Sequence, residues 1–133
     1  MTVINFVGYS VKEMVFEQKE LLNQDNIEKQ RIKQSFRTKT DIQGNKANVQ
    51  LEYHVAPEAP IKLDVIIVGQ FIFNSEEDKT NTGFEKYLKT NAVAILFPYL
   101  RQVVTTLTAT SNIMQPIILP TVNISQLLYG KNN

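Results

Sequence analysis

Residues 91–107, NAVAILFPYLRQVVTTL, form the most apolar run of the chain and place Pro98 near its middle. At 3.6 residues per turn, the apolar side chains of this run nearly encircle a helix axis. A polar or neutral stripe is left by four residues: Pro98, Arg101, Thr105 and Thr108. A surface helix normally keeps a broad polar face. The pattern therefore predicts a helix that is buried on two sides, with a second subunit as the candidate for the second side.

Pro98 also predicts how this helix is shaped. Proline has no backbone N–H, and its ring crowds the carbonyl four residues earlier, here that of Ala94. We therefore expect the helical region to kink or restart near Phe97, so that it forms two short pieces instead of one rod.

Residues on either side of this run predict where the helices begin. Thr82 and Glu85 have the spacing of a capping box, in which each side chain bonds the other's free backbone amide. A helical region should start there. Asn123 and Gln126 predict the start of a final short helix, which Gly130 should end.

The first half of the chain has the two-residue period of β-strands. Residues 31–42 and 48–55 both alternate between apolar and polar side chains, and Gly44 and Asn45 between them suit a turn. These segments predict an antiparallel hairpin. Val49, Leu51, Tyr53 and Val55 are expected to face inward.

Two further strands flank the hairpin. Residues 61–74 are apolar on both faces, which predicts a central strand that is covered twice. Residues 3–16 change parity near Lys12 and Glu13, which predicts a β-bulge or bend. Residues 17–30 are a polar connection, either a short helix or a crossover loop.

The composition fits one domain, residues 1–133, and provides few parts for catalysis. There are 14 basic and 13 acidic residues, so net charge does not attract nucleic acid or lipid. With no cysteine and one histidine, His54, neither an enzyme nor a cofactor or metal site is expected. No run approaches the ~20 apolar residues that cross a bilayer, so we predict a cytoplasmic protein without membrane insertion.

The strongest polar pattern is a basic row on one face of the first hairpin strand: Arg31, Lys33, Arg37 and Lys39. Such a row could bind RNA if aromatic side chains stood among the charges, but Phe36 falls on the opposite face. We interpret the row as a solvated strand that resists edge pairing, or as a polar partner patch, and we do not favour nucleic acid as a partner. His54 beside Glu52, and the acidic residues 76–78, are interpreted as exposed and solvated.

Two stretches resemble the SecB family of export chaperones. Residues 96–101, LFPYLR, match the family's Leu-Phe-Pro-Tyr-Ala-Arg run with one substitution, and residues 122–124 match its Pro-Val-Asn-Phe run loosely, with Pro120 displaced by one residue. The order of elements is similar over nearly the whole chain. The resemblance implies an α+β fold, a four-stranded antiparallel sheet followed by helices packed on one face, in subunits that form homo-oligomers, either dimers or tetramers.

The resemblance also implies a function. Family members hold unfolded polypeptides without ATP in long grooves lined by apolar and aromatic side chains. The candidates for polypeptide binding or for the oligomer interface are Phe97, Tyr99, Phe71, Phe73, Val103 and Val104, and core packing is the favoured role of the four aromatic residues.

The basic row departs from the acidic surface by which export chaperones of this family dock on the translocation ATPase. We therefore expect a holdase for non-native polypeptide, or for a dedicated protein client, and we do not favour a role in export. An oligomeric scaffold or regulator without a client groove is the alternative.

Overall fold

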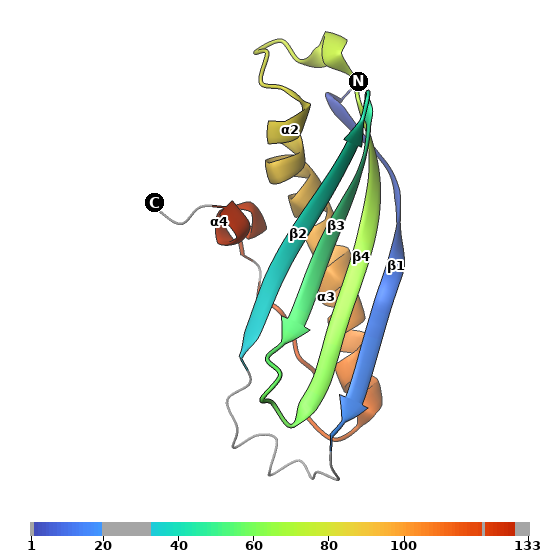
Figure 1. Ribbon diagram of the computed structural model, residues 1–133, viewed down its shortest axis with the longest axis vertical. Coiled ribbons are helices and arrows are strands. Elements are labelled where there is room, and N and C mark those ends of the chain that lie inside the picture. Colours follow the sequence, from blue (N-terminus) through green and yellow to red (C-terminus); the bar gives the residue numbers. More distant parts are fainter. Residues whose placement is uncertain (1, 20–32, 121, 130–133) are drawn as a thin grey trace.

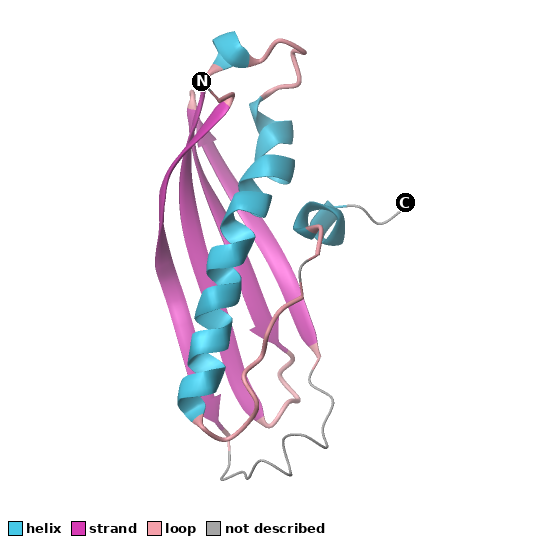
Figure 2. Cartoon of the chain, turned by 180° about the vertical axis from the view of Figure 1, so that it is seen from behind, coloured by secondary structure: helices cyan, strands magenta, loops and turns pink. Residues whose placement is uncertain are grey.

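The computed structural model describes residues 2–19, 33–120 and 122–129. Four strands form one antiparallel sheet in the order β1-β4-β3-β2. Their bounds are β1 Ile4–Gln18, β2 Gln34–Gln43, β3 Lys46–Val55 and β4 Ile61–Phe73. A long helical segment crosses one face of this sheet, while no described element covers the other face (Figures 1 and 2). The expected α+β architecture is confirmed; the predicted connection over residues 17–30 lies largely outside the described residues.

The predicted hairpin is formed by β2 and β3. Gln43 pairs with Lys46 across a two-residue turn, and Gly44 takes the left-handed φ of +63° that this turn requires. The four residues expected to face inward are all buried: Val49, Leu51, Tyr53 and Val55. The hydroxyl of Tyr53 donates to Oε1 of Gln34 at 2.7 Å, and burial raises the pKa of Tyr53 to about 12.

β4 is a central strand, as predicted, and its inward row is interrupted by Gly69. An added Cβ at Gly69 would lie 2.5 Å from Cδ2 of Leu96, closer than carbon atoms can approach. The outward residues Ile66, Val68 and Ile72 are half-buried by neighbouring side chains of the sheet. The expected second cover over this strand is therefore not supplied by any described part of the chain.

β1 contains two bulges. The register with β4 shifts between Val11 and Glu13, where a bulge was predicted, and also between Phe6 and Gly8. Each shift adds one residue to β1 and reverses which parity faces inward. Six apolar residues that seemed to occupy both faces consequently share the inward face: Ile4, Phe6, Tyr9, Val11, Met14 and Phe16.

The helical segment runs through α2 (Phe84–Tyr87), a π-helical turn (Leu88–Ala92) and α3 (Val93–Ser111). The predicted break near Phe97 is wrong, because α3 continues through Pro98. Ala94, whose carbonyl loses its partner, and Pro98 are both exposed. Water can therefore bond the freed carbonyl, and the proline ring has room.

The irregularity lies instead in the π-helical turn. Every fourth residue of the segment is buried: Phe84, Leu88, Ala92, Leu96, Leu100, Val104 and Thr108. In an ideal α-helix such a row rotates by about 40° at each step and would leave the sheet. A π-helical turn holds more residues per turn and so reverses part of this drift between Leu88 and Ala92. The helix therefore departs from ideal geometry in this turn and not at the proline.

The 28 helical residues Phe84–Ser111 are long and apolar enough to span a bilayer by length and composition alone, contrary to the expectation that no run comes close. The core helix of a sheet protein satisfies the same criterion. Here Leu96, Leu100 and Val104 are fully buried in the core formed with the sheet.

The predicted capping box at Thr82 is also wrong, since Asp78 organises the helix start. Asp78 accepts the backbone N–H of Thr82 at 3.0 Å and of Gly83 at 2.8 Å, and the hydroxyl of Tyr87 donates to it at 3.1 Å. The Gly83 bond, foremost, holds the pKa of Asp78 below its usual range. Asp78 is therefore structural, whereas the sequence placed it in a solvated acidic run.

Replacing Asp78 with Ala is expected to loosen the start of α2, because two backbone amides lose their acceptor. Amide hydrogen exchange of Thr82, Gly83 and Tyr87 should accelerate. Thr82→Ala is the matched control, since the hydroxyl it removes bonds the side chain of Thr80 and caps no helical amide. Equal acceleration of amide exchange in the two variants would instead support the capping box predicted from the sequence.

The chain after α3 folds back beside it and ends in α4, Ile124–Tyr129 (Figure 2). Arg101 donates from Nε to the carbonyl of Leu119 at 2.8 Å, and Thr105 donates to the carbonyl of Ile117 at 2.8 Å. Thr108, expected on a polar stripe, is fully buried and accepts the N–H of Ile117. The predicted stripe thus binds this returning segment.

α4 begins as predicted at Asn123, whose side-chain oxygen accepts the N–H of Gln126 at 3.1 Å. Its first residue, Ile124, is buried against the core. The stop predicted at Gly130 lies outside the described residues.

Candidate functional site: an uncharged helical surface

The helical side of the molecule is nearly devoid of charge. Between Lys89 and Lys131, Arg101 is the only charged residue of the sequence. Several side chains of α3 are nevertheless exposed, among them Pro98, Gln102 and Thr106. Protein surfaces that face water usually carry many charges, and an uncharged one is typical of surfaces that become covered.

One flank of α3 faces β1 and is lined by aromatic and apolar side chains. The rings of Tyr9 and Tyr99 stack with their centroids 4.4 Å apart, and Phe6 lies 5.8 Å from Tyr99. Along β1 the inward side chains Val11 and Met14 remain 40% and 58% exposed. We call the five residues Phe6, Tyr9, Val11, Met14 and Tyr99 the β1 flank. It is an apolar strip beside a free sheet edge.

A shallow cleft lies on the other flank, between α3 and α4, with a volume of about 910 Å³. Ile95, Pro98 and Tyr129 contribute apolar walls, while Asn91 and Gln126 contribute amide groups. Its lining contains one charged residue, Arg101. This cleft is more polar at its rim than the β1 flank.

The structure divides the six predicted candidates into two groups. Phe71, Phe97 and Val104 are buried in the core, although Phe97 also lines the cleft between α3 and α4. Phe73 is half-buried and stacks on Phe84 at 4.9 Å, so it packs the upper end of the helix. Tyr99 and Val103 are partly exposed beside the core. These two therefore stay candidates for a partner surface.

Sequence reasoning missed Tyr9, Val11 and Met14 as surface candidates. Their common face is hidden in the sequence, because the bulges at Val7 and Lys12 interrupt a simple two-residue period. The register that places Tyr9 opposite Gly69 and Met14 opposite Val65 depends on both bulges, so no local pattern shows it.

The open face of the sheet carries charges of both signs. Arg37 and Lys39 point outward on β2 as predicted, opposite Glu52 and Gln50 of β3. Of the other two members of the basic row, Lys33 is exposed and Arg31 lies outside the described residues. One acidic residue, Glu52, therefore lies opposite the row, at Arg37.

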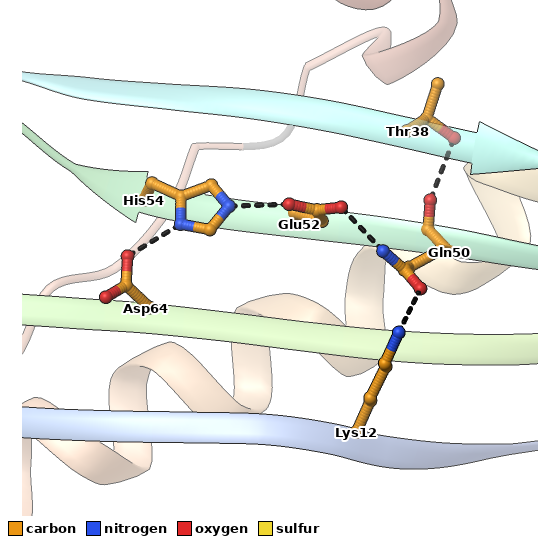
Figure 3. A network of polar contacts seen from close by, with 6 residues as sticks. All are labelled: Lys12, Thr38, Gln50, Glu52, His54 and Asp64. Carbon is orange, nitrogen blue, oxygen red and sulfur yellow. Dashed lines mark hydrogen bonds and ion pairs between the residues drawn. The ribbon is translucent and has the colours of Figure 1, made fainter.

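A chain of polar contacts crosses this open face (Figure 3). Lys12 donates to Oε1 of Gln50 at 3.1 Å, and Gln50 donates from Nε2 to Oε2 of Glu52 at 2.6 Å. Oε1 of Glu52 lies 2.7 Å from Nε2 of His54, and Oδ1 of Asp64 lies 2.6 Å from Nδ1 of His54. The interpretation of His54 as a solvated surface residue is wrong, because its side chain is 22% exposed and doubly paired.

These contacts shift two pKa values. Burial alone would lower the pKa of His54, but the bonds to Asp64 and Glu52 outweigh it and raise this pKa. Burial alone would raise the pKa of Glu52, but the bonds from His54 and Gln50 hold it below its usual range. Both shifts favour the charged forms.

Ser35, His54 and Asp64 lie opposite one another on β2, β3 and β4, which are the residue types of a hydrolase triad. A serine would need Nε2 of His54 to take its proton. That nitrogen is bonded to Glu52 instead. This row therefore lacks the geometry of a triad, and no group of three His, Asp or Glu side chains among the described residues is arranged to hold a metal ion.

The sequence matches no protein-family model. In three dimensions, the fold is similar to the Mycobacterium tuberculosis Rv1957 SecB-like chaperone, solved in complex with a ChAD peptide from the Rv1956 HigA1 antitoxin. The TM-score is 0.69 with 16% sequence identity, and the match covers 90% of each chain. The chain therefore has a SecB-like fold.

In sequence, the chain is 30% identical over 136 aligned positions to the uncharacterized protein MJ0357 of Methanocaldococcus jannaschii. This match covers 94% of the chain and 82% of the archaeal protein. The chain belongs to the same family as MJ0357.

Proposed function

We propose that this protein is a holdase: it binds extended, non-native polypeptide without ATP, along the helical side of the molecule. The observation that carries the proposal is the β1 flank, where the stacked Tyr9 and Tyr99 continue into the exposed Val11 and Met14. Covering such a strip removes apolar surface from water, and this gain does not depend on a particular client sequence.

The position of β1 supports an extended client. β1 is an edge strand, and no described strand pairs with the side that faces away from β4. Backbone N–H and C=O groups on this side of β1 can bond the backbone of an added strand while the apolar side chains bind alternate residues of that strand. Backbone bonding and apolar contact together are suited to unfolded segments.

The solved structural neighbour supports the kind of partner. That SecB-like chaperone binds a peptide of an antitoxin, which is a protein client. We therefore include a dedicated protein client beside general non-native polypeptide in the proposal.

Tyr9→Asp and Met14→Asp test this proposal in an aggregation assay. The unmodified protein at equimolar or lower ratio should suppress light scattering by a chemically denatured substrate diluted into buffer. Each substitution should weaken suppression, because a carboxylate in the strip must be desolvated when a client binds.

Ser10→Asp is the matched control, because it places the same charge on the outward face of the same strand. It should suppress aggregation as the unmodified protein does. The absence of suppression by the unmodified protein at every ratio would contradict the holdase proposal, as would equal losses in Ser10→Asp and Tyr9→Asp.

We also propose that copies of the chain assemble through the exposed face of α3. Pro98, Gln102 and Thr106 form an uncharged surface next to the half-buried Ile95 and Tyr99. The same observation favours a second candidate function, an oligomeric scaffold or regulator without a client. An assembled protein that fails the aggregation assay would support this second function.

A further inference from the structure

We propose that Glu52, His54 and Asp64 form a proton-binding site on the open face of the sheet, and that the bound proton clasps β3 to β4. The hydrogen-bond donors available at the imidazole ring decide its protonation state. A carboxylate oxygen can only accept a hydrogen bond, and here one faces each nitrogen of the imidazole ring, at 2.7 Å and 2.6 Å.

A neutral imidazole has a single N–H, so it can satisfy one of these carboxylates but not both. Its second nitrogen would then direct a lone pair at an oxygen of the other carboxylate, across a distance shorter than an ordinary hydrogen bond. The observed arrangement therefore requires the imidazolium ion. Loss of the proton must break either the Glu52 contact or the Asp64 contact.

The two contacts have different consequences for the fold. Glu52 is on the same strand as His54, two residues away, whereas Asp64 is directly opposite on β4. Release of Asp64 would remove a side-chain link between two central strands. Because Gln50 already holds Glu52 in place, the contact to Asp64 is the one that we expect to be lost.

Proton binding also changes the charge of the open face. The three groups together carry one negative charge when His54 is protonated and two when it is neutral. The nearest other charges on this face come from β1, β4, β2 and the residue just before β2: Lys12, Glu13, Glu17, Lys33, Arg37, Lys39 and Lys62. Arg37 lies opposite Glu52 and acts on its carboxylate, which favours the charged network.

The direction of the pH dependence follows from the two pKa shifts. The pKa of His54 is raised, so its contribution is complete below the unfolded value of about 6.5 and is lost as the pH rises through the folded value. The pKa of Glu52 is lowered, so its contribution is complete above about 4.3 and is lost as the pH falls through the folded value. The clasp is therefore complete between about pH 4.3 and about pH 6.5.

Nuclear magnetic resonance of the imidazole ring tests the site directly, because His54 is the only histidine. We expect the folded protein to titrate above about 6.5, with both ring nitrogens showing the imidazolium shift below that midpoint. Asp64→Asn and Glu52→Gln should each move the midpoint down. Asp41→Asn, which removes an exposed carboxylate elsewhere on the same face, should leave it unchanged.

A midpoint at or below about 6.5 in the unmodified protein would overturn the proposal. So would midpoints that do not respond to Asp64→Asn or Glu52→Gln. His54→Gln provides an independent readout: its thermal midpoint should fall furthest below that of the unmodified protein between about pH 4.3 and about pH 6.5, and the gap should narrow at higher pH. A gap that is constant with pH would also overturn the proposal.

Discussion

Gly69→Ala is expected to lower the free energy of unfolding by about 1–3 kcal/mol, the usual cost of forcing extra atoms into a packed core. The added Cβ would meet Cδ2 of Leu96 at 2.5 Å and the ring of Phe71 at 3.0 Å. Both side chains are buried, so neither can turn toward solvent. Relief requires α3 to move away from the sheet, and Gly69→Val should be more damaging still.

Urea denaturation of the two glycine variants measures this effect. Gly8→Ala is the matched control, because Gly8 lies on the neighbouring strand and an added Cβ there meets nothing within 4 Å. Leu96→Ala should also destabilise the fold, by about 2–5 kcal/mol, by opening a cavity. The double variant Gly69→Ala, Leu96→Ala should lose less free energy of unfolding than the sum of the losses in the two single variants. If Gly69→Ala and Gly8→Ala lower the free energy of unfolding by the same small amount, α3 does not pack this closely on β4.

Gln102→Glu combined with Thr106→Asp is expected to dissociate the proposed oligomer. Both side chains are exposed on the uncharged face of α3, so the single subunit should tolerate the change. In an interface made of this face, an unpaired carboxylate costs about 3–5 kcal/mol to bury. That cost weakens association more than about a hundredfold.

Light scattering coupled to size exclusion measures the result as molecular mass. Ser10→Glu on the open face of the sheet is the control, and its mass should equal that of the unmodified protein. Urea midpoints of the isolated subunits separate dissociation from unfolding. A monomeric mass for the unmodified protein at micromolar concentration would remove the assembly proposal, and an unchanged mass in the double variant would exclude this face as the interface.

The hairpin of β2 and β3 could be predicted residue by residue, because uninterrupted alternation determines which side chains face the core. β1 could not, since its two bulges lie in a strand whose partner is distant in sequence. One parity change was visible near Lys12. The other, at Val7, is apparent only when Phe6 and Tyr9 are seen opposite Phe71 and Gly69.

Pro98 shows that the effect of a proline within a helix depends on its surroundings. The lost hydrogen bond at Pro98 was correctly expected, but its effect depends on whether the freed carbonyl meets water or core. Pro98 and Ala94 are exposed, so α3 continues. The irregular turn lies at Leu88–Ala92 instead, where the sequence contains no proline.

The candidate site was only partly predictable for a related reason. Aromatic residues in strand and helix patterns mark the core as readily as a surface, and Phe71 and Phe97 are core. Tyr99 was a candidate from the sequence, but its stack with Tyr9 is a contact between residues 90 positions apart (99 − 9). Such contacts depend on how α3 is placed across the sheet, which local patterns do not specify.

The sheet order determines when β1 can pair with its neighbour during synthesis. β2, β3 and β4 follow one another and can pair as they leave the ribosome, whereas β1 pairs only with β4 among the described strands. β1 emerges first but must wait for residues 61–73 before it can join. Until then its apolar side chains have no partner strand, so the nascent protein is itself a non-native chain in need of protection.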